Sequence, residues 1–231
     1  MSRGKEVSQN YFPDTRWSVI RQACGGGDLS EFCKNYWKPI YDYICSCGYK
    51  KDVAEEMAQM FFEKLLAKSA EKRFPEKLNG KFRAYMKRSV KNFLTDQWRF
   101  KQRKSREGSH VVTDINDELT ADYQAAPDVE FDKSWVQSVI AIALSNLRKE
   151  SESAGNGELF EQVAPLLDGR TRDGEGKELA KKLGMKAGTF RVMLSRSRQR
   201  LRQLIEMEIR STVSSQQEFE EEVGYLFEIW S

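Results

Sequence analysis

The chain has 231 residues, of which 39% are hydrophobic and 32% are charged, and its formal net charge is +3. Its 13 Phe, 8 Tyr and 5 Trp residues can build hydrophobic cores, which excludes a chain that is disordered throughout. Its apolar runs fall far short of the roughly 20 residues that span a bilayer. The first ten residues are polar and lack the apolar segment of an export signal. We therefore expect a cytoplasmic protein without membrane insertion.

Histidine and cysteine usage argues against an enzyme or a metal site. The single histidine, His110, lies beside Gly108 and Ser109, so a histidine-based triad or a multi-histidine metal site has no partners. Four cysteines lie near the N-terminus with spacings unlike those of zinc ligands: Cys24, Cys33, Cys45 and Cys47. We predict reduced thiols, no catalytic residues, no metal and no cofactor.

Helical periodicity runs through most of the chain. Apolar residues recur at helical spacing over residues 14–24, 28–44, 51–68 and 81–104, which predicts one helical domain over residues 12–106. Residues 107–128 lack an apolar face and read as a flexible acidic linker. Helices are again predicted from residue 129, giving a second domain over 129–210 and a helical tail over 211–231. The expected fold is all-α, with two helical domains.

Charge alternates in blocks along the sequence. Residues 81–106 carry ten bases against one acid, and residues 177–202 carry nine bases against one acid. Each basic block is followed by an acidic one, with eight acids in residues 107–133 and six in residues 206–222. Two separate basic segments predict two anion-binding surfaces, and nucleic acid is the repeating polyanion that they would bind. Solvated helix faces are the alternative interpretation.

The second basic block carries the spacing of a helix-turn-helix. Ala180 is small where two helices would cross, and Gly184, four positions later, suits a turn that needs positive φ. Phe190, Met193 and Leu194 would anchor the second helix, whose outer face is rich in arginine. This pattern favours binding in the major groove of DNA over a plain helical hairpin.

The first basic block interleaves cations with aromatic rings. Arg88, Asn92 and Asp96 share one side of the predicted helix, and Trp98 stands among the bases that follow. Cations neutralise phosphates while rings stack on exposed bases, a combination that suits single-stranded nucleic acid. The alternative is that Trp98 extends the apolar stripe through Leu94 and is buried.

Three segments resemble bacterial RNA polymerase sigma factors of the small extracytoplasmic-function class in the sigma-70 family. The segment 53–66 resembles the helix that docks on the polymerase, 82–99 resembles the segment that melts and reads the −10 element, and 176–204 resembles the helix-turn-helix that reads the −35 element. The order of the segments matches the family over residues 14–210. The chain departs from it at Val192 and Met193, where members often carry Ser-Arg.

The resemblance implies promoter DNA and core RNA polymerase as partners, and a site residue set for each. Contacts with the −10 element are expected from Arg83, Arg88, Lys91, Asn92, Asp96, Trp98, Arg99 and Arg103. Contacts with the −35 element are expected from Lys186, Thr189, Arg191, Ser195, Arg196, Arg198 and Arg202. The polymerase is expected to contact Asp52, Glu55, Glu56, Gln59, Phe62 and Lys64. The resemblance also implies an anti-sigma factor as a partner, since such a partner is common in the family.

Two other functions fit part of the pattern. A stand-alone helix-turn-helix repressor or activator would bind duplex DNA tightly without polymerase, usually as a dimer. A DNA-processing enzyme with a helix-turn-helix would need a nucleophile and a charged cluster in residues 12–106, and the sequence offers no convincing set. The tail beyond Arg210 exceeds the minimal length of the family, and we expect it to pack on the second domain or to regulate it.

Overall fold

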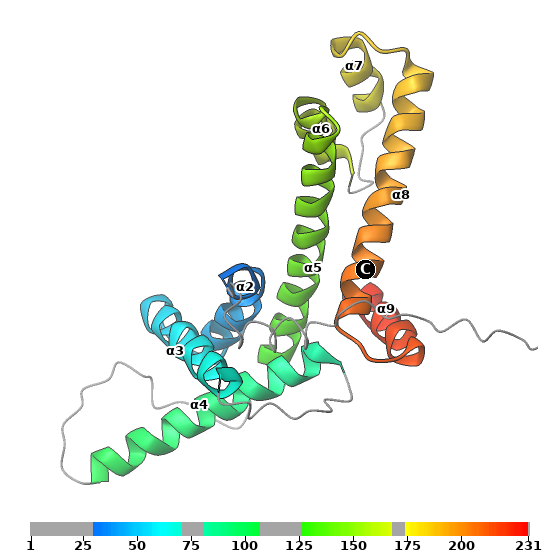
Figure 1. The fold of residues 1–231 in the computed structure, drawn as a ribbon. Coiled ribbons are helices and arrows are strands. Elements are labelled where there is room, and N and C mark those ends of the chain that lie inside the picture. The colour runs from blue at the N-terminus through cyan, green and yellow to red at the C-terminus, as the bar shows by residue number, and fades with distance from the viewer. Residues whose placement is uncertain (1–29, 71–80, 107–125, 168–173, 231) are drawn as a thin grey trace, which may run out of the picture. The chain divides into compact units, whose positions relative to one another are not determined.

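The computed structural model describes residues 30–70, 81–106, 126–167 and 174–230, and every regular element in these ranges is helical (Figure 1). The elements are α2 (Ser30–Ser46), α3 (Lys51–Ala70), α4 (Phe82–Arg106), α5 (Ala126–Ser153), α6 (Gly157–Val163), the short 3-10 helix η2 (Ala164–Leu166), α7 (Glu175–Lys182), α8 (Ala187–Ser211) and α9 (Gln216–Trp230). The predicted all-α class is confirmed for this part of the chain. None of the described helices is long and apolar enough to cross a membrane.

The predicted helices and the observed ones agree closely at most boundaries. α2 continues through Pro39 as one helix, and it ends before Gly48, whose φ of 89° is a conformation that glycine adopts without strain. α5 begins at Ala126, within the stretch expected to be a linker. The expected helix at 14–24, residues 107–125 of the expected linker, His110 and Cys24 lie outside the described residues.

The contacts divide the chain into two compact units. The first comprises residues up to Trp135 together with Arg210–Ser231, and the second comprises Val136–Ile209. The second unit is thus an insertion in the first, and its limits differ from the expected domain of 129–210 on two counts. The start of α5 belongs with α2, α3 and α4, and the tail belongs with the first unit rather than with the second.

An aromatic cluster forms the centre of the first unit. Tyr36 of α2 packs on Phe82 of α4 and on Trp135 of α5, with ring centroids 5.5 and 4.9 Å apart. These three side chains are almost completely buried. Their spacing along each helix, at intervals of three or four residues from other buried apolar side chains, explains why these segments are helical. α4 is therefore held firmly along its apolar face, which leaves its opposite face for solvent.

A separate core holds the second unit together. Ala143 and Leu147 of α5 pack with residues of α6, α7 and α8, including Ala180 and Leu201. Phe190 and Leu194, which the sequence predicted as anchors of the second helix, are buried in this core. The stripe of apolar residues fixes which side of α8 is buried and which side carries its arginines.

Candidate nucleic-acid interfaces

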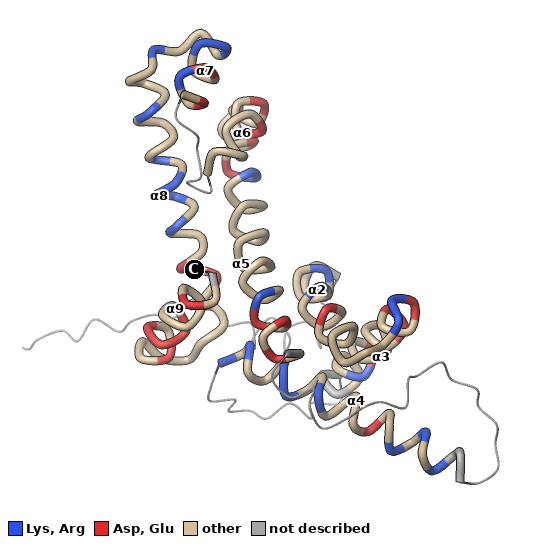
Figure 2. The backbone as a smooth tube through the Cα atoms, turned by 180° about the vertical axis from the view of Figure 1, so that it is seen from behind, with Lys and Arg blue, Asp and Glu red and all other residues tan. Residues whose placement is uncertain are grey.

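Lysine and arginine residues are concentrated on α4 in the first unit and on α8 in the second (Figure 2). Seven of the eight residues expected at the −10 element are exposed on α4: Arg88, Lys91, Asn92, Asp96, Trp98, Arg99 and Arg103. Trp98 keeps 46% of its surface exposed, so it does not extend the buried stripe through Leu94. Phe100, which follows it, is 49% exposed. The exposed part of α4 therefore combines cations with rings.

Arg83 differs from the other seven residues because its side chain is buried. Its guanidinium contacts two carboxylates, with Nε 2.6 Å from Glu222 Oε1 and NH1 2.5 Å from Asp132 Oδ1. Burial by itself would lower the pKa of Arg83, but the hydrogen bonds and charges of Glu222 and Asp132 raise this pKa above its ordinary value. The expectation that Arg83 contacts DNA is therefore wrong for this structure. Its position at the start of α4, on the buried side, makes it part of the interior.

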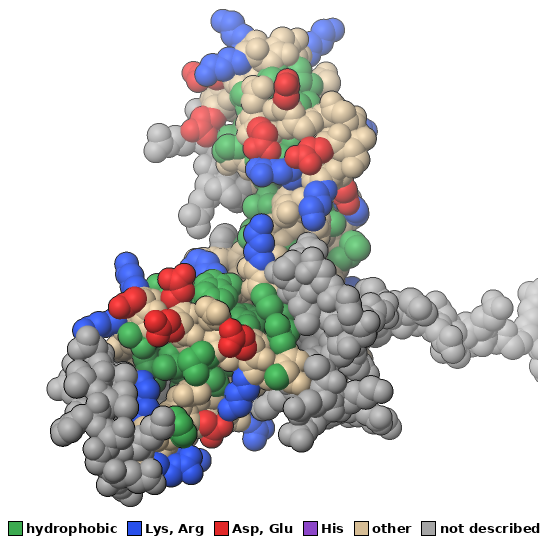
Figure 3. Space-filling model, turned by 60° about the vertical axis from the view of Figure 1, so that its left-hand side comes forward, with side chains coloured by type: hydrophobic (Ala, Val, Ile, Leu, Met, Phe, Trp, Pro, Cys, Tyr) green, Lys and Arg blue, Asp and Glu red, His purple; other side chains and the backbone are tan. Residues whose placement is uncertain are grey.

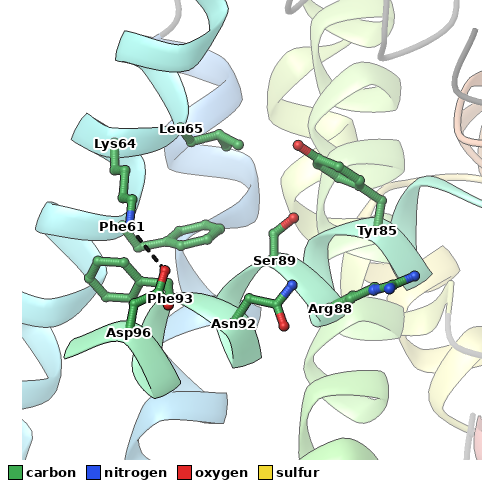
Figure 4. Close-up of a pocket in the computed structure, with 9 residues that line it drawn as sticks. All are labelled: Phe61, Lys64, Leu65, Tyr85, Arg88, Ser89, Asn92, Phe93 and Asp96. Atoms are coloured by element: carbon green, nitrogen blue, oxygen red, sulfur yellow. Dashed lines mark hydrogen bonds and ion pairs between the residues drawn. The ribbon is translucent and has the colours of Figure 1, made fainter. Parts of the chain in front are cut away.

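A groove of about 330 Å³ lies between α3 and α4 (Figure 4). Its apolar surface comes from Phe61 and Leu65 of α3 and from Phe93 and Tyr85 of α4. Its polar side chains are Lys64, Arg88, Ser89, Asn92 and Asp96. The volume falls within the range of pockets that hold small molecules or parts of larger ligands. Arg88, Asn92 and Asp96, which the sequence placed on one side of α4, all line this groove.

The two ends of the groove differ in their polar groups. At one end Lys64 reaches from α3 toward Asp96 of α4, with Nζ 3.5 Å from Oδ2 (Figure 4). At the other end stand Arg88 and Tyr85, and Asn92 and Ser89 lie between the ends. Amide and hydroxyl groups both donate and accept hydrogen bonds, and aromatic side chains offer flat apolar contact. The groove thus offers a ligand both hydrogen-bonding groups and apolar surface.

Sequence reasoning missed most of the α3 side of this groove. Lys64 was expected to contact the polymerase, but its ammonium lies 5.6 Å from the centroid of the Phe93 ring, at the groove. Phe61, Leu65 and Ser89 have no motif that would distinguish them from ordinary helix residues. Ser89 lies one turn from Asn92 on α4, but only the packing of α3 against α4 brings Phe61 and Leu65 to this groove.

The expected polymerase contacts on α3 are exposed with one exception. Five of the six are exposed: Asp52, Glu55, Glu56, Gln59 and Lys64. Phe62 is buried instead, and its ring stacks on Trp37 at 5.8 Å, so its side chain is not available to a partner in this structure. Met60 is 41% exposed. Figure 3 shows acidic and basic side chains around hydrophobic ones over this unit.

In the second unit, α7 and α8 are joined by a short turn. Gly184 in this turn has φ of 66°, as its position in the pattern predicted. Ala180 on α7 is buried, and Gly176 lies near Phe190, such that an added Cβ would meet the ring at 3.6 Å. The small residues on α7 therefore allow close approach of α8.

Six of the seven residues expected at the −35 element are exposed: Lys186, Thr189, Arg191, Ser195, Arg196 and Arg202. The seventh, Arg198, donates hydrogen bonds from Nε and NH2 to the carbonyl of Leu166, at 3.2 and 2.6 Å. It therefore ties α8 to the end of η2. Arg200, which the pattern did not include, pairs with Glu150 of α5 at 2.6 Å. The exposed cations of α8 begin at its N-terminal end.

Comparisons with known proteins provide no identification, since no family model, no curated protein and no solved structure matches this chain. Function must consequently be inferred from the residues and the geometry described above.

Proposed function

We propose that the chain is a promoter-specificity subunit of bacterial RNA polymerase, of the sigma type, and that it is not itself an enzyme. One observation carries the proposal: two separate compact units each present an exposed basic helix, and the basic helix of the first unit also presents exposed rings and lines a groove. A protein that only binds duplex DNA needs an exposed basic helix such as that of the second unit, without exposed rings or a groove. A protein that also holds an opened strand needs both kinds of surface.

The first unit would hold the unpaired strand of the −10 element. Lys91, Arg99 and Arg103 would neutralise phosphates, and Trp98 would stack on a base. The groove beside Arg88 and Asn92 would receive a base extruded from the duplex, with hydrogen bonds to its edge. Extruding a base costs a few kcal/mol, which binding free energy would supply.

The second unit would bind the −35 element as a helix-turn-helix. α8 would enter the major groove with its N-terminal end, where Lys186, Thr189 and Arg191 are exposed. Arginine at a base edge discriminates guanine by a bidentate pair worth about 1–3 kcal/mol. Arg198, in contrast, would hold α8 in place through Leu166 rather than contact DNA.

Core RNA polymerase would dock on the exposed side of α3. Asp52, Glu55, Glu56 and Gln59 are exposed at one turn after another of this helix, and they are available to a cationic or polar partner. The acidic segment after α4 would enter a polymerase channel built for RNA, because a negative peptide can replace a negative strand. Bond formation would belong to the polymerase.

The test is transcription by core polymerase on sheared genomic DNA from the source organism, with the 5′ ends of transcripts sequenced. The proposal expects start sites that depend on this chain and share two sequence elements at a fixed spacing. Arg88→Ala should alter the preference at the nearer element, and Arg191→Ala should relax the farther one. Arg148→Ala is the matched control, since Arg148 is an exposed arginine on α5 of the second unit. Absence of any chain-dependent start site would contradict the proposal.

A further inference from the structure

The C-terminal segment packs into the first unit through a network of buried charges. Glu222 of α9 is 0% exposed, and it contacts Arg83 through both carboxylate oxygens, at 2.6 Å to Nε and 3.1 Å to NH2. Arg83 also contacts Asp132 of α5, whose other oxygen accepts hydrogen bonds from Lys87 at 2.9 Å and from the hydroxyl of Tyr225 at 2.6 Å. One network thus joins α4, α5 and α9.

The same segment supplies a hydrogen bond to the first turn of α4. The amide of Phe82 donates to the carbonyl of Thr212 at 2.8 Å, which satisfies one of the amides that a helix start leaves without an internal partner. Lys81, just before α4, pairs with Glu221 of α9 at 3.1 Å. Val213, Phe219 and Leu226 are buried, so apolar packing accompanies the polar contacts.

α9 has its own local start signal, so it is encoded as a helix and not merely as a trailing segment. Ser215 accepts a hydrogen bond from the amide of Glu218 at 3.2 Å, and the Glu218 carboxylate accepts one from the amide of Ser214 at 2.7 Å. The first bond is the N-cap half of a capping box, and the second ties the Glu218 carboxylate to the residue before the N-cap. The Arg210 guanidinium lies 3.8 Å from the centroid of the Phe219 ring, which fixes the turn between α8 and α9.

The position of α9 shows whether it supports α4 or covers the exposed residues of α4 that are proposed to bind a DNA strand. Its Glu222 and Tyr225 contact Arg83, an interior residue, while Arg88, Asn92, Asp96 and Trp98 remain exposed with α9 in place. A tail that blocked the strand-binding surface would cover those residues instead. A buried ion pair contributes little net stability over an apolar pair, but removal of one partner is destabilising because it leaves a buried charge uncompensated.

We propose that α9 completes the strand-binding surface of the first unit, with Glu222 as the residue that positions the start of α4 through Arg83. The part of this inference that concerns DNA rests on the proposed function, whereas the positioning of α4 does not. The second unit is not expected to depend on this contact, since its core contains no residue of α9.

The first experiment is amide hydrogen exchange on the full chain carrying Glu222→Gln. This change leaves Arg83 buried with one carboxylate fewer, so amides in the first two turns of α4 should exchange at least about tenfold faster. Amides of α7 and of the first half of α8 should keep their wild-type rates. The control is Glu228→Gln, which removes the same charge from an exposed position of α9. Unchanged exchange at the start of α4 would overturn the inference.

The second experiment measures binding of a fluorescent single-stranded oligonucleotide and of a duplex by the same variants in complex with core polymerase. Glu222→Gln should weaken strand binding several-fold and leave duplex binding through the second unit unchanged. Stronger strand binding would show that α9 masks the surface, which would overturn the inference. If the wild-type chain bound no DNA, the proposed function would fail while the exchange result would still decide the positioning of α4.

If the Glu222→Gln variant does not fold, a charge reversal provides an alternative test of the contact between α9 and α4. Lys81→Glu places a carboxylate against Glu221 and Glu222, and should accelerate exchange at the start of α4. Adding Glu221→Lys restores an attractive pair and should return part of the protection. Failure of the second substitution to rescue the first would show that α9 does not act on α4 through this contact.

Discussion

Burial decides the role of each charged or aromatic residue on α4. Arg83 and Arg88 are the same residue type on one helix, yet Arg83 is buried between two carboxylates and Arg88 is exposed at the groove. The sequence pattern placed both on a basic helix. It could not reveal that Asp132 and Glu222, which are 49 and 139 residues away from Arg83, would surround it.

Trp98 offers a direct test of base stacking. Trp98→Ala should weaken binding of single-stranded DNA by the polymerase complex by about 1–3 kcal/mol, the usual contribution of one stacked base. Trp98→Phe keeps a ring and should retain most of the affinity. Because Trp98 is 46% exposed, neither change should lower the thermal unfolding temperature by much. Equal strand affinity of the alanine variant and the wild type in an anisotropy titration would contradict stacking.

Cys47 should react slowly with alkylating reagents. Burial raises the pKa of its thiol to about 11, and only the thiolate reacts. At pH 8 this shift makes the native thiol roughly a hundredfold slower than an ordinary thiol of pKa about 9, and the rate should rise about tenfold per pH unit up to pH 10. Mass spectrometry of the peptide after timed alkylation measures the rate. The denatured chain is the control, and equal rates in both states would show that the thiol is not protected.

At the scale of elements, the turn between α7 and α8 depends on one glycine. Gly184 has φ of 66°, which costs other L-residues about 1–2 kcal/mol. Gly184→Ala should therefore destabilise the second unit by about this amount, measured as a shift of its denaturant midpoint.

The matched control for that turn is another glycine of the same unit. Gly188 lies in the first turn of α8, has no positive φ, and an added Cβ would meet no atom within 4 Å. Gly188→Ala should be neutral or stabilise by up to about 1 kcal/mol. If the two variants lowered stability equally, the backbone of Gly184 would not be the cause.

Helices were predictable from the sequence because their evidence is local. Apolar residues at three- and four-residue spacing identified α2, α3 and α4 within a few residues of their observed bounds. The start of α5 was missed by three residues because Ala126, Pro127 and Asp128 resemble a linker in composition, although Pro and Asp also favour the first turn of a helix.

Contacts between distant elements were not predictable in the same way. The groove depends on the packing of α3 against α4, and the partner of α9 depends on a chain that returns to the first unit after the second is complete. Nothing in the acidic tail specifies whether Glu222 faces solvent or Arg83. If α9 were rotated about its axis by the angle that separates two consecutive residues, Glu221 instead of Glu222 would face Arg83.

At the scale of the whole molecule, the basic and acidic blocks of the sequence can be assigned to the two units. Each exposed basic helix lies in its own unit, and the acidic residues after α8 are partly used inside the first unit, at Glu221 and Glu222. The small net charge of +3 therefore conceals two cationic surfaces. We expect one to bind single-stranded DNA and the other to bind duplex DNA.

We propose that the chain works only with core RNA polymerase, and gel filtration of the purified chain with that enzyme tests this proposal most directly. We predict a stoichiometric complex that is lost when Glu55→Lys and Glu56→Lys are combined on the exposed side of α3. The complex should persist when the same charges are reversed at Glu152 and Glu158, which are exposed in the second unit. A chain that elutes apart from the polymerase, yet binds duplex DNA alone at nanomolar concentration, would contradict the account and would instead be a stand-alone transcription regulator.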